Sequence, residues 1–142
     1  MLIQLDFSAV LSAWPLLVRG VVWTIGLTIV GTVLGLLLGT ACAWARARNL
    51  GHRPTALRWA VASYVELVRN TPFIVQLFFL FFGLPALGLK LSPEFASVLA
   101  MVINLGAYSA EIIRAGIEAT PRGQIEAAHS LALTPGQTFR RV

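Results

Sequence analysis

The chain has 142 residues, of which 57% are hydrophobic and only 12% are charged. A soluble domain usually carries about 25% charged residues, so this composition excludes an ordinary soluble enzyme. The mean hydropathy of +0.78 indicates a helical membrane protein. The net charge of +5 does not indicate nucleic-acid binding, because the basic residues stand at the ends of apolar runs and not on one soluble face.

The first apolar run predicts the clearest membrane span, over residues 20–45. These 26 residues carry no charge and would form about 39 Å of helix, enough to cross a hydrocarbon core of about 30 Å. Residues 1–18 contain no Lys or Arg, so they lack the charged leader of a secretory signal, and we expect the run to remain in the mature protein. Gly31, Gly35 and Gly39 share one helix face, which predicts close packing against a partner helix.

A second span is predicted over residues 58–84. Its most apolar part, residues 73–84, has only 12 residues and is too short to cross alone, so the helix must begin earlier. We expect a bend at Pro72, where a backbone donor is missing, and an end at Gly83 and Pro85.

The third span is predicted over residues 94–114. Ser92 is a candidate N-cap, Pro93 suits the first helical position, and Glu94 is favourable in the first turn. The fold class is therefore an all-α integral membrane protein, with one transmembrane domain over residues 1–142 and a cytoplasmic segment over 115–142.

The distribution of basic residues predicts the orientation. Four arginines follow the first span and four follow the third, whereas one arginine and one lysine lie on the other side. The two groups are Arg46, Arg48, Arg53, Arg58, Arg114, Arg122, Arg140 and Arg141 against Arg19 and Lys90. By the positive-inside rule the N-terminus lies outside and the C-terminus lies in the cytoplasm.

Several polar residues fall within the predicted spans. The acid and base of Glu66–Arg69 and of Glu111–Arg114 are three residues apart, so each pair can neutralise itself or reach the membrane surface. Alternatively, such residues face a water-filled path. On the third span, Asn104, Tyr108 and Glu111 lie on one stripe, which fits either a substrate path or hydrogen bonds between helices. The candidates for a substrate path are Glu66, Arg69, Gln76, Asn104, Tyr108 and Glu111.

The sequence offers no catalytic or metal-binding constellation. Cys42 is the only cysteine, so an internal disulfide and a cysteine-based metal site are both excluded. There is no metal-ligand spacing and no phosphate-binding glycine loop. We therefore predict a protein that is not an enzyme and holds no cofactor, so any ATP used must be bound by a partner chain.

A short helix of about a dozen residues is predicted after the third span. Thr120 before Pro121 resembles its N-cap, and Thr134 with Gln137 resembles a capping box that starts the next helix. Its small side chains and few basic residues favour docking into a protein groove over binding to a lipid surface. The expected apolar face contains Ile125, Ala128, Leu131 and Ala132, and Arg122 and Glu126 are spaced to form an ion pair.

Four sequence blocks together resemble the membrane permease subunits of ATP-binding-cassette (ABC) importers for polar amino acids. Residues 20–24 (GVVWT) resemble the entry to that family's first span, and residues 64–79 (YVELVRNTPFIVQLFF) its second-span signature. Residues 108–117 (YSAEIIRAGI), followed by 121–124 (PRGQ), resemble the stretch before the coupling motif. Glu126-Ala127-Ala128 is similar to the coupling motif itself.

This resemblance implies a permease of the bacterial inner membrane that works by alternating access. The partners it implies are ABC ATPase subunits, a second permease subunit, an extracytoplasmic solute-binding protein and a polar amino acid as substrate. The residues that would couple the permease to the ATPase are Gly123, Glu126, Ala127, Ala128 and Ala132. Two other classes of protein are also compatible with these residues: a secondary transporter or channel with Glu66 and Glu111 as ion sites, and a purely structural membrane protein.

The chain departs from the family pattern in two places. Ala132 stands where the motif normally has glycine, so we expect a stiffer or shifted turn there. Family members continue through further spans, usually five in all, so we expect a chain that is truncated at its C-terminus.

Overall fold

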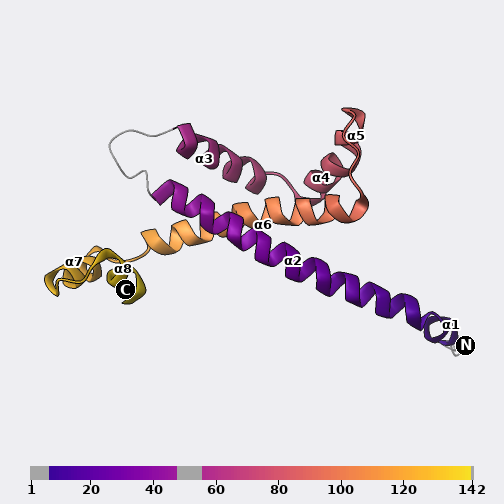
Figure 1. The fold of residues 1–142 in the computed structure, drawn as a ribbon, viewed down its shortest axis with the longest axis horizontal. Coiled ribbons are helices and arrows are strands. Elements are labelled where there is room, and N and C mark those ends of the chain that lie inside the picture. The colour runs from indigo at the N-terminus through magenta and orange to yellow at the C-terminus, as the bar shows by residue number, and fades with distance from the viewer. Residues whose placement is uncertain (1–6, 48–55, 142) are drawn as a thin grey trace, which may run out of the picture.

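The computed structural model describes residues 7–47 and 56–141, and every regular element in these two ranges is a helix. The all-α prediction is confirmed, while the predicted cytoplasmic arginines Arg48 and Arg53 lie outside the described residues. Figure 1 shows the order of the elements along the chain. They are α1 Ser8–Ser12, α2 Trp14–Ala47, α3 Ala56–Arg69, α4 Phe73–Phe78, the π-helix η1 Phe79–Gly83, α5 Leu84–Ala86, α6 Pro93–Glu118, α7 Arg122–Ser130 and α8 Pro135–Arg141.

Helices α2 and α6 form the centre of the fold and cross each other (Figure 1). A Cβ added to Gly31 would meet Met101, one added to Gly35 would meet Leu105, and one added to Gly39 would meet Ser109. The residue numbers rise together on both helices, so α2 and α6 run parallel. The face of α2 that carries the three glycines therefore lies against α6 at close range.

Two parallel spans require the chain between them to return across the membrane. By length and apolar composition α2 and α6 each suffice to cross, and the bent pair of α3 with α4–α5 supplies a third span if it is counted as one. Helix α2 extends beyond the predicted 20–45 at both ends because the exposed Arg19 does not interrupt it. Helix α6 likewise runs four residues past the predicted end, to Glu118.

The second span is broken where the sequence predicted a bend. Helix α3 ends at Arg69 and α4 begins at Phe73. The direction of the chain bends by 107° between the two halves, across Pro72. The prediction that Gly83 and Pro85 end this span is wrong. Gly83 lies inside η1, and Pro85 falls in the first turn of α5, where no backbone donor is needed, so the helix continues to Ala86.

The predicted start of α6 is confirmed in detail. Ser92 is the N-cap, and its hydroxyl oxygen accepts the backbone N–H of Phe95 at 3.2 Å. Pro93 is the first helical residue and Glu94 lies in the first turn, where its charge interacts favourably with the helix dipole.

Helices α7 and α8 lie beyond the C-terminal end of α6 (Figure 1). The prediction that Thr120 caps α7 is wrong, because Pro121 is the N-cap residue and the Thr120 hydroxyl donates to the carbonyl of Gly116 at 3.5 Å. Helix α7 has nine residues and not about a dozen, because Ala132 leaves the helical conformation. The capping box before α8 is present: the Thr134 N–H donates to Gln137 Oε1 at 2.9 Å.

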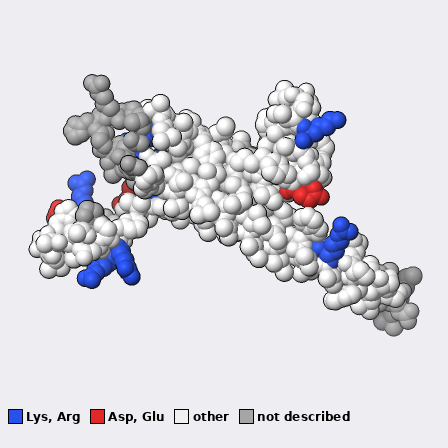
Figure 2. Space-filling view, in the orientation of Figure 1, with Lys and Arg blue, Asp and Glu red and all other residues white. Residues whose placement is uncertain are grey.

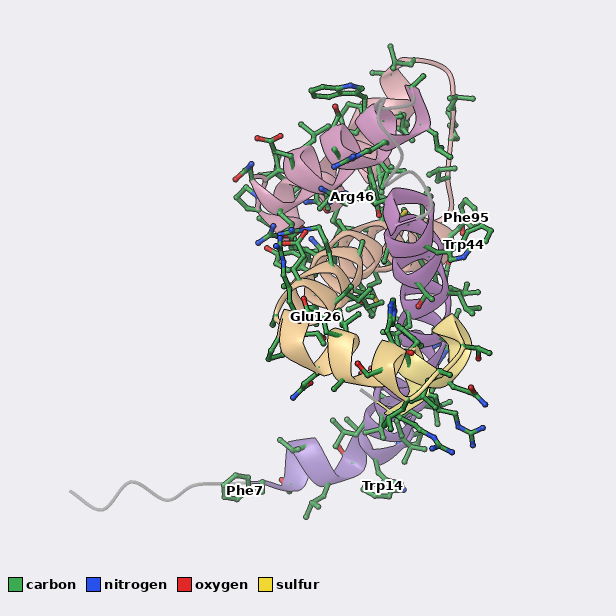
Figure 3. The ribbon with its side chains drawn as sticks, turned by 90° about the vertical axis from the view of Figure 1, so that its left-hand side faces the viewer. Phe7, Trp14, Trp44, Arg46, Phe95 and Glu126 are labelled. Atoms are coloured by element: carbon green, nitrogen blue, oxygen red, sulfur yellow. The ribbon has the colours of Figure 1, made fainter. Side chains whose placement is uncertain are left out.

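The completely buried residues of the core are alanines, and many large apolar side chains are exposed. Ala96, Ala100, Ala107 and Ala110 of α6 are fully buried, whereas Trp14 and Trp44, near the two ends of α2, are 63% and 59% exposed (Figure 3). Figure 2 shows the charged side chains at the two ends of the molecule, with uncharged surface between them. This distribution suits contact with lipid or with further apolar protein in the middle of the molecule.

Candidate functional site

One carboxylate, that of Glu111 in α6, is bound by arginines from three helices. The Nε of Arg114 donates to Glu111 Oε2 at 2.9 Å, and its terminal nitrogen donates to Oε1 at 2.6 Å. Arg46 of α2 lies 3.6 Å from Oε2 and Arg69 of α3 lies 3.4 Å from Oε1. Only 20% of the Glu111 side chain is exposed, so this ionic cluster joins the three helices in a partly shielded environment.

The ionic cluster changes the predicted pairing of charges within single helices. The predicted Glu111–Arg114 pair is present, and Arg114 also pairs with Glu118 one turn further along α6. The predicted Glu66–Arg69 pair does not form, because Arg69 at the end of α3 turns to Glu111 of α6. Periodicity within α3 cannot reveal that partner, which comes from a helix 42 residues away along the chain.

A cavity of about 410 Å³ lies beside the ionic cluster between α2, α3 and α6. Opposite charges line it, from Glu66 and Glu111 on one hand and from Arg46 and Arg69 on the other. The Arg69 guanidinium also lies 5.9 Å from the centre of the Tyr108 ring, a cation–π distance. Four of the six predicted path residues therefore line this cavity, namely Glu66, Arg69, Tyr108 and Glu111.

The other two predicted path residues, Gln76 and Asn104, hydrogen-bond to each other. The Asn104 amide donates to Gln76 Oε1 at 3.3 Å, and the Gln76 amide donates to the carbonyls of Val68 at 2.8 Å and Thr71 at 2.9 Å. Gln76 therefore satisfies carbonyls that are left open where α3 breaks. Of the two interpretations of these deep polar residues, hydrogen bonding between helices describes this pair.

The predicted coupling residues of α7 differ in exposure. Gly123, Glu126 and Ala127 are exposed, and Figure 3 shows Glu126 on α7. Ala128 is only 3% exposed, and its carbonyl accepts the N–H of Leu133 in the turn toward α8. The predicted Arg122–Glu126 ion pair is not present among the described residues.

Ala132 adopts a left-handed backbone conformation. Its φ is +53°, in the region that favours glycine and disfavours residues with a Cβ. The turn has the backbone conformation typical of glycine although the residue is alanine. Replacing glycine by alanine at this position therefore strains the backbone locally and does not shift the turn.

Sequence reasoning missed two residues that shape the site. Arg46 was assigned only to the cytoplasmic charge count, yet it reaches Glu111, and Figure 3 shows it near the C-terminal end of α2. The Tyr64 hydroxyl donates to the carbonyl of Ile103 at 2.6 Å and so ties α3 to α6. Nothing in a single sequence distinguishes this Tyr from an interfacial aromatic residue. The described ranges contain no group of three His, Cys, Asp or Glu side chains that could hold a metal ion.

The fold and the cavity define a polytopic helical membrane protein with a charged pocket between its spans. The family model described as binding-protein-dependent transport system inner membrane component matches residues 35–142, and the chain belongs to this family. The membership confirms the predicted resemblance to the membrane permease subunits of ABC importers.

Curated relatives and a solved structure agree with this membership. The L-cystine transport system permease protein TcyB of Bacillus subtilis (strain 168) is 42% identical over 131 residues, which cover 92% of this chain and 54% of the relative. The arginine transport system permease protein ArtQ of the same organism is 36% identical, with coverage of 96% and 61%. The glutamine transport system permease protein GlnP of Escherichia coli (strain K12) is 34% identical, with coverage of 98% and 63%.

The crystal structure of an amino acid ABC transporter with histidines superimposes with a TM-score of 0.83 at 36% sequence identity. The match covers 97% of this chain and 63% of that chain. The chain thus spans about 54% to 63% of the length of these relatives and of the solved transporter chain.

Proposed function

We propose that this chain is part of the membrane permease of an ABC importer for polar amino acids. The observation that carries the proposal is the family match over residues 35–142, which includes all of α3 to α6, the cavity and α7. The relatives named for L-cystine, arginine and glutamine transport support a polar amino acid as the substrate class.

The proposed assembly places α7 in the cytoplasm, in a groove of a separate ATPase subunit. Helix α7 lies outside the crossing of α2 and α6, and three residues separate it from the end of α6. Glu126 is exposed and meets a basic partner there, while Ala128 is buried and its carbonyl accepts the Leu133 N–H of the turn after α7. ATP is bound by the partner, a second permease subunit completes the path, and a solute-binding protein delivers the amino acid from outside. Closure of the ATPase is passed to the spans as a rigid-body movement.

The orientation of this proposal follows the positive-inside rule. Helices α7 and α8 carry Arg122, Arg140 and Arg141, and basic segments stay on the cytoplasmic side. The C-terminal helices therefore lie inside and the N-terminus lies outside. The parallel course of α2 and α6 supports the same side for both of their C-terminal ends.

The cavity between α2, α3 and α6 is the proposed part of the substrate path. An amino acid carries a carboxylate and an ammonium group, and the cavity offers Arg69 and Glu66 as partners of opposite charge. Gln76 and Asn104 do not line the cavity; they contribute indirectly, by holding the break in the second span.

Uptake into proteoliposomes tests the proposal. The permease assembly containing this chain is reconstituted with its ATPase subunits and binding protein, and uptake of a panel of radiolabelled polar amino acids is measured. We expect uptake that requires ATP on the ATPase side. Uptake driven by an ion gradient without nucleotide would contradict the proposal.

Affinity measurements on the same assembly test the path residues. We expect Glu66→Gln to weaken amino-acid binding, because it removes a negative partner from the cavity. Asn104→Leu should weaken binding indirectly, through the break that Gln76 supports. Unchanged affinities in both variants would remove these residues from the path.

A further inference from the structure

Arg69 is the most exposed of the arginines in the ionic cluster. Arg114 makes two charge-assisted hydrogen bonds to Glu111, whereas Arg69 reaches it through one nitrogen at 3.4 Å. The Arg69 side chain is 42% exposed, compared with 31% for Arg114 and 23% for Arg46. Because bidentate pairs are stronger than single contacts and solvent screens exposed ones, the Arg69–Glu111 contact is weaker than the Arg114–Glu111 pair.

The position of Arg69 gives this contact mechanical importance. Arg69 is the last residue of α3 and directly precedes the 107° break, so its contact with Glu111 fixes the end of α3 against α6. The same residue lines the 410 Å³ cavity and stands over the Tyr108 ring. Movement of Arg69 away from Glu111 therefore changes the width of the cavity between α3 and α6.

The other attachments of α3 are apolar contacts with α2 and α6 and a few hydrogen bonds, including the link from the Val68 carbonyl through Gln76 to Asn104 of α6. Val65 and Val68 pack against Ala107 and Ala110 in a small apolar cluster, and Tyr64 hydrogen-bonds to α6. By contrast, α2 and α6 are in close contact at all three glycines, against side chains of α6 at Gly31 and Gly35 and against its backbone at Gly39. The charge of Glu111 thus matters most for the position of α3 and least for the crossing of α2 and α6.

We infer that Glu111 is a positioning residue whose carboxylate holds the Arg69 end of α3 against α6 and thereby sets the closed width of the cavity. Without the carboxylate, the guanidiniums of Arg46, Arg69 and Arg114 repel one another. The most weakly packed element then moves outward. The role in transport rests on the proposed function, but the effect on helix position does not.

Distances between spin labels in the 142-residue chain, embedded in lipid nanodiscs, test this inference. One label pair joins Ser63 in α3 to Ile117 in α6, and a second joins Leu37 in α2 to Ile117; all three side chains are exposed. Cys42 is replaced by alanine in this background so that labelling is specific. We expect Glu111→Gln to shift the Ser63–Ile117 distance to longer and broader values while the Leu37–Ile117 distance stays unchanged.

Three further variants make the test specific. Glu118→Gln removes a carboxylate that pairs only with Arg114 within α6, so neither distance should change. Arg69→Gln should shift the Ser63–Ile117 distance in the same direction but by less, because it removes the attraction to Glu111 without leaving a repelled guanidinium, and the double variant should shift no further than Glu111→Gln. Arg69→Lys keeps the positive charge, so the Ser63–Ile117 distance should stay short in this variant.

The inference is overturned if Glu111→Gln leaves the Ser63–Ile117 distance as in the unmodified chain. If Glu111→Gln does not fold, Arg69→Gln decides, and an unchanged distance in that variant overturns the inference equally. The measurement uses neither ATP nor substrate. The inference about Glu111 can therefore fail while uptake by the assembly succeeds. Equally, the inference can hold while uptake fails.

Discussion

At the scale of single residues, Gly39 marks the closest approach of α2 to α6. A Cβ at this position would lie 2.5 Å from the Cβ of Ser109 and 2.9 Å from the carbonyl oxygen of Gly106. Part of this contact is backbone, which cannot rotate away, so any side chain here forces the helices apart.

Gly39→Ala is expected to destabilise the protein by about 1–3 kcal/mol, the usual range for overpacking. Gly26→Ala is the matched control, since a Cβ at Gly26 meets nothing within 4 Å. Because alanine favours helix over glycine, that control should be neutral or more stable by up to about 1 kcal/mol. Unfolding of the purified protein in detergent measures both, and equal effects would contradict the assigned packing.

Ala132 is the second residue whose backbone decides its behaviour. Its φ of +53° costs an alanine about 1 kcal/mol or more relative to glycine, so Ala132→Gly should stabilise the turn between α7 and α8. Slower hydrogen exchange of the α7–α8 amides would show the gain. Ala127→Gly, within α7, should have the opposite sign, with a loss of about 1 kcal/mol. A destabilising effect of Ala132→Gly would show that the conformation is not strained.

At the scale of elements, the break between α3 and α4 is held chiefly by Gln76, and the Thr71 hydroxyl adds a bond to the Leu67 carbonyl at 2.7 Å. The Gln76 amide nitrogen lies within hydrogen-bonding distance of the Val68 and Thr71 carbonyls and of the Thr71 hydroxyl, and its oxygen accepts from Asn104. A helix end inside a membrane has no water to satisfy its carbonyls, so this arrangement makes the 107° turn tolerable.

Gln76→Leu should cost about 1–3 kcal/mol, because it removes the donor to the Thr71 carbonyl and leaves the Val68 carbonyl only longer contacts with the Thr71 N–H and hydroxyl. Hydrogen exchange should become faster in residues 66–78 and remain slow in α2. Ser97→Ala is the control, since the Ser97 hydroxyl only donates back to the Pro93 carbonyl of its own helix. Uniformly faster exchange over the whole chain would contradict a local role for Gln76.

At the scale of the whole molecule, the elements follow from the sequence more closely than the contacts between them. The charge-free run ending at Ala45 and the signals at Ser92 and Pro72 predicted two helices and one break, because these features act over a few residues. The pairing of Arg69 with Glu111 was not predictable, since it depends on how α3 lies across α6. The same holds for Gln76, whose partners are fixed by the angle of the break.

The polar stripe on α6 shows this limit within one element. Asn104, Tyr108 and Glu111 share a face, as their spacing predicted, but they take different partners. Asn104 binds Gln76, Tyr108 lies beside Arg69, and Glu111 gathers the arginines. Periodicity identified the shared face of α6. Which of its residues supports the break and which line the cavity depends on how the second span packs against that face.

The side of the membrane on which α7 lies tests the central claim most directly, since only a cytoplasmic α7 can be reached by an ATPase. A single cysteine at the exposed Glu126, in a chain whose buried Cys42 is replaced by alanine, is treated with a membrane-impermeant maleimide. The account predicts no labelling in intact cells and labelling in inverted membrane vesicles from which the ATPase subunits have been removed. Labelling of intact cells from outside would contradict it.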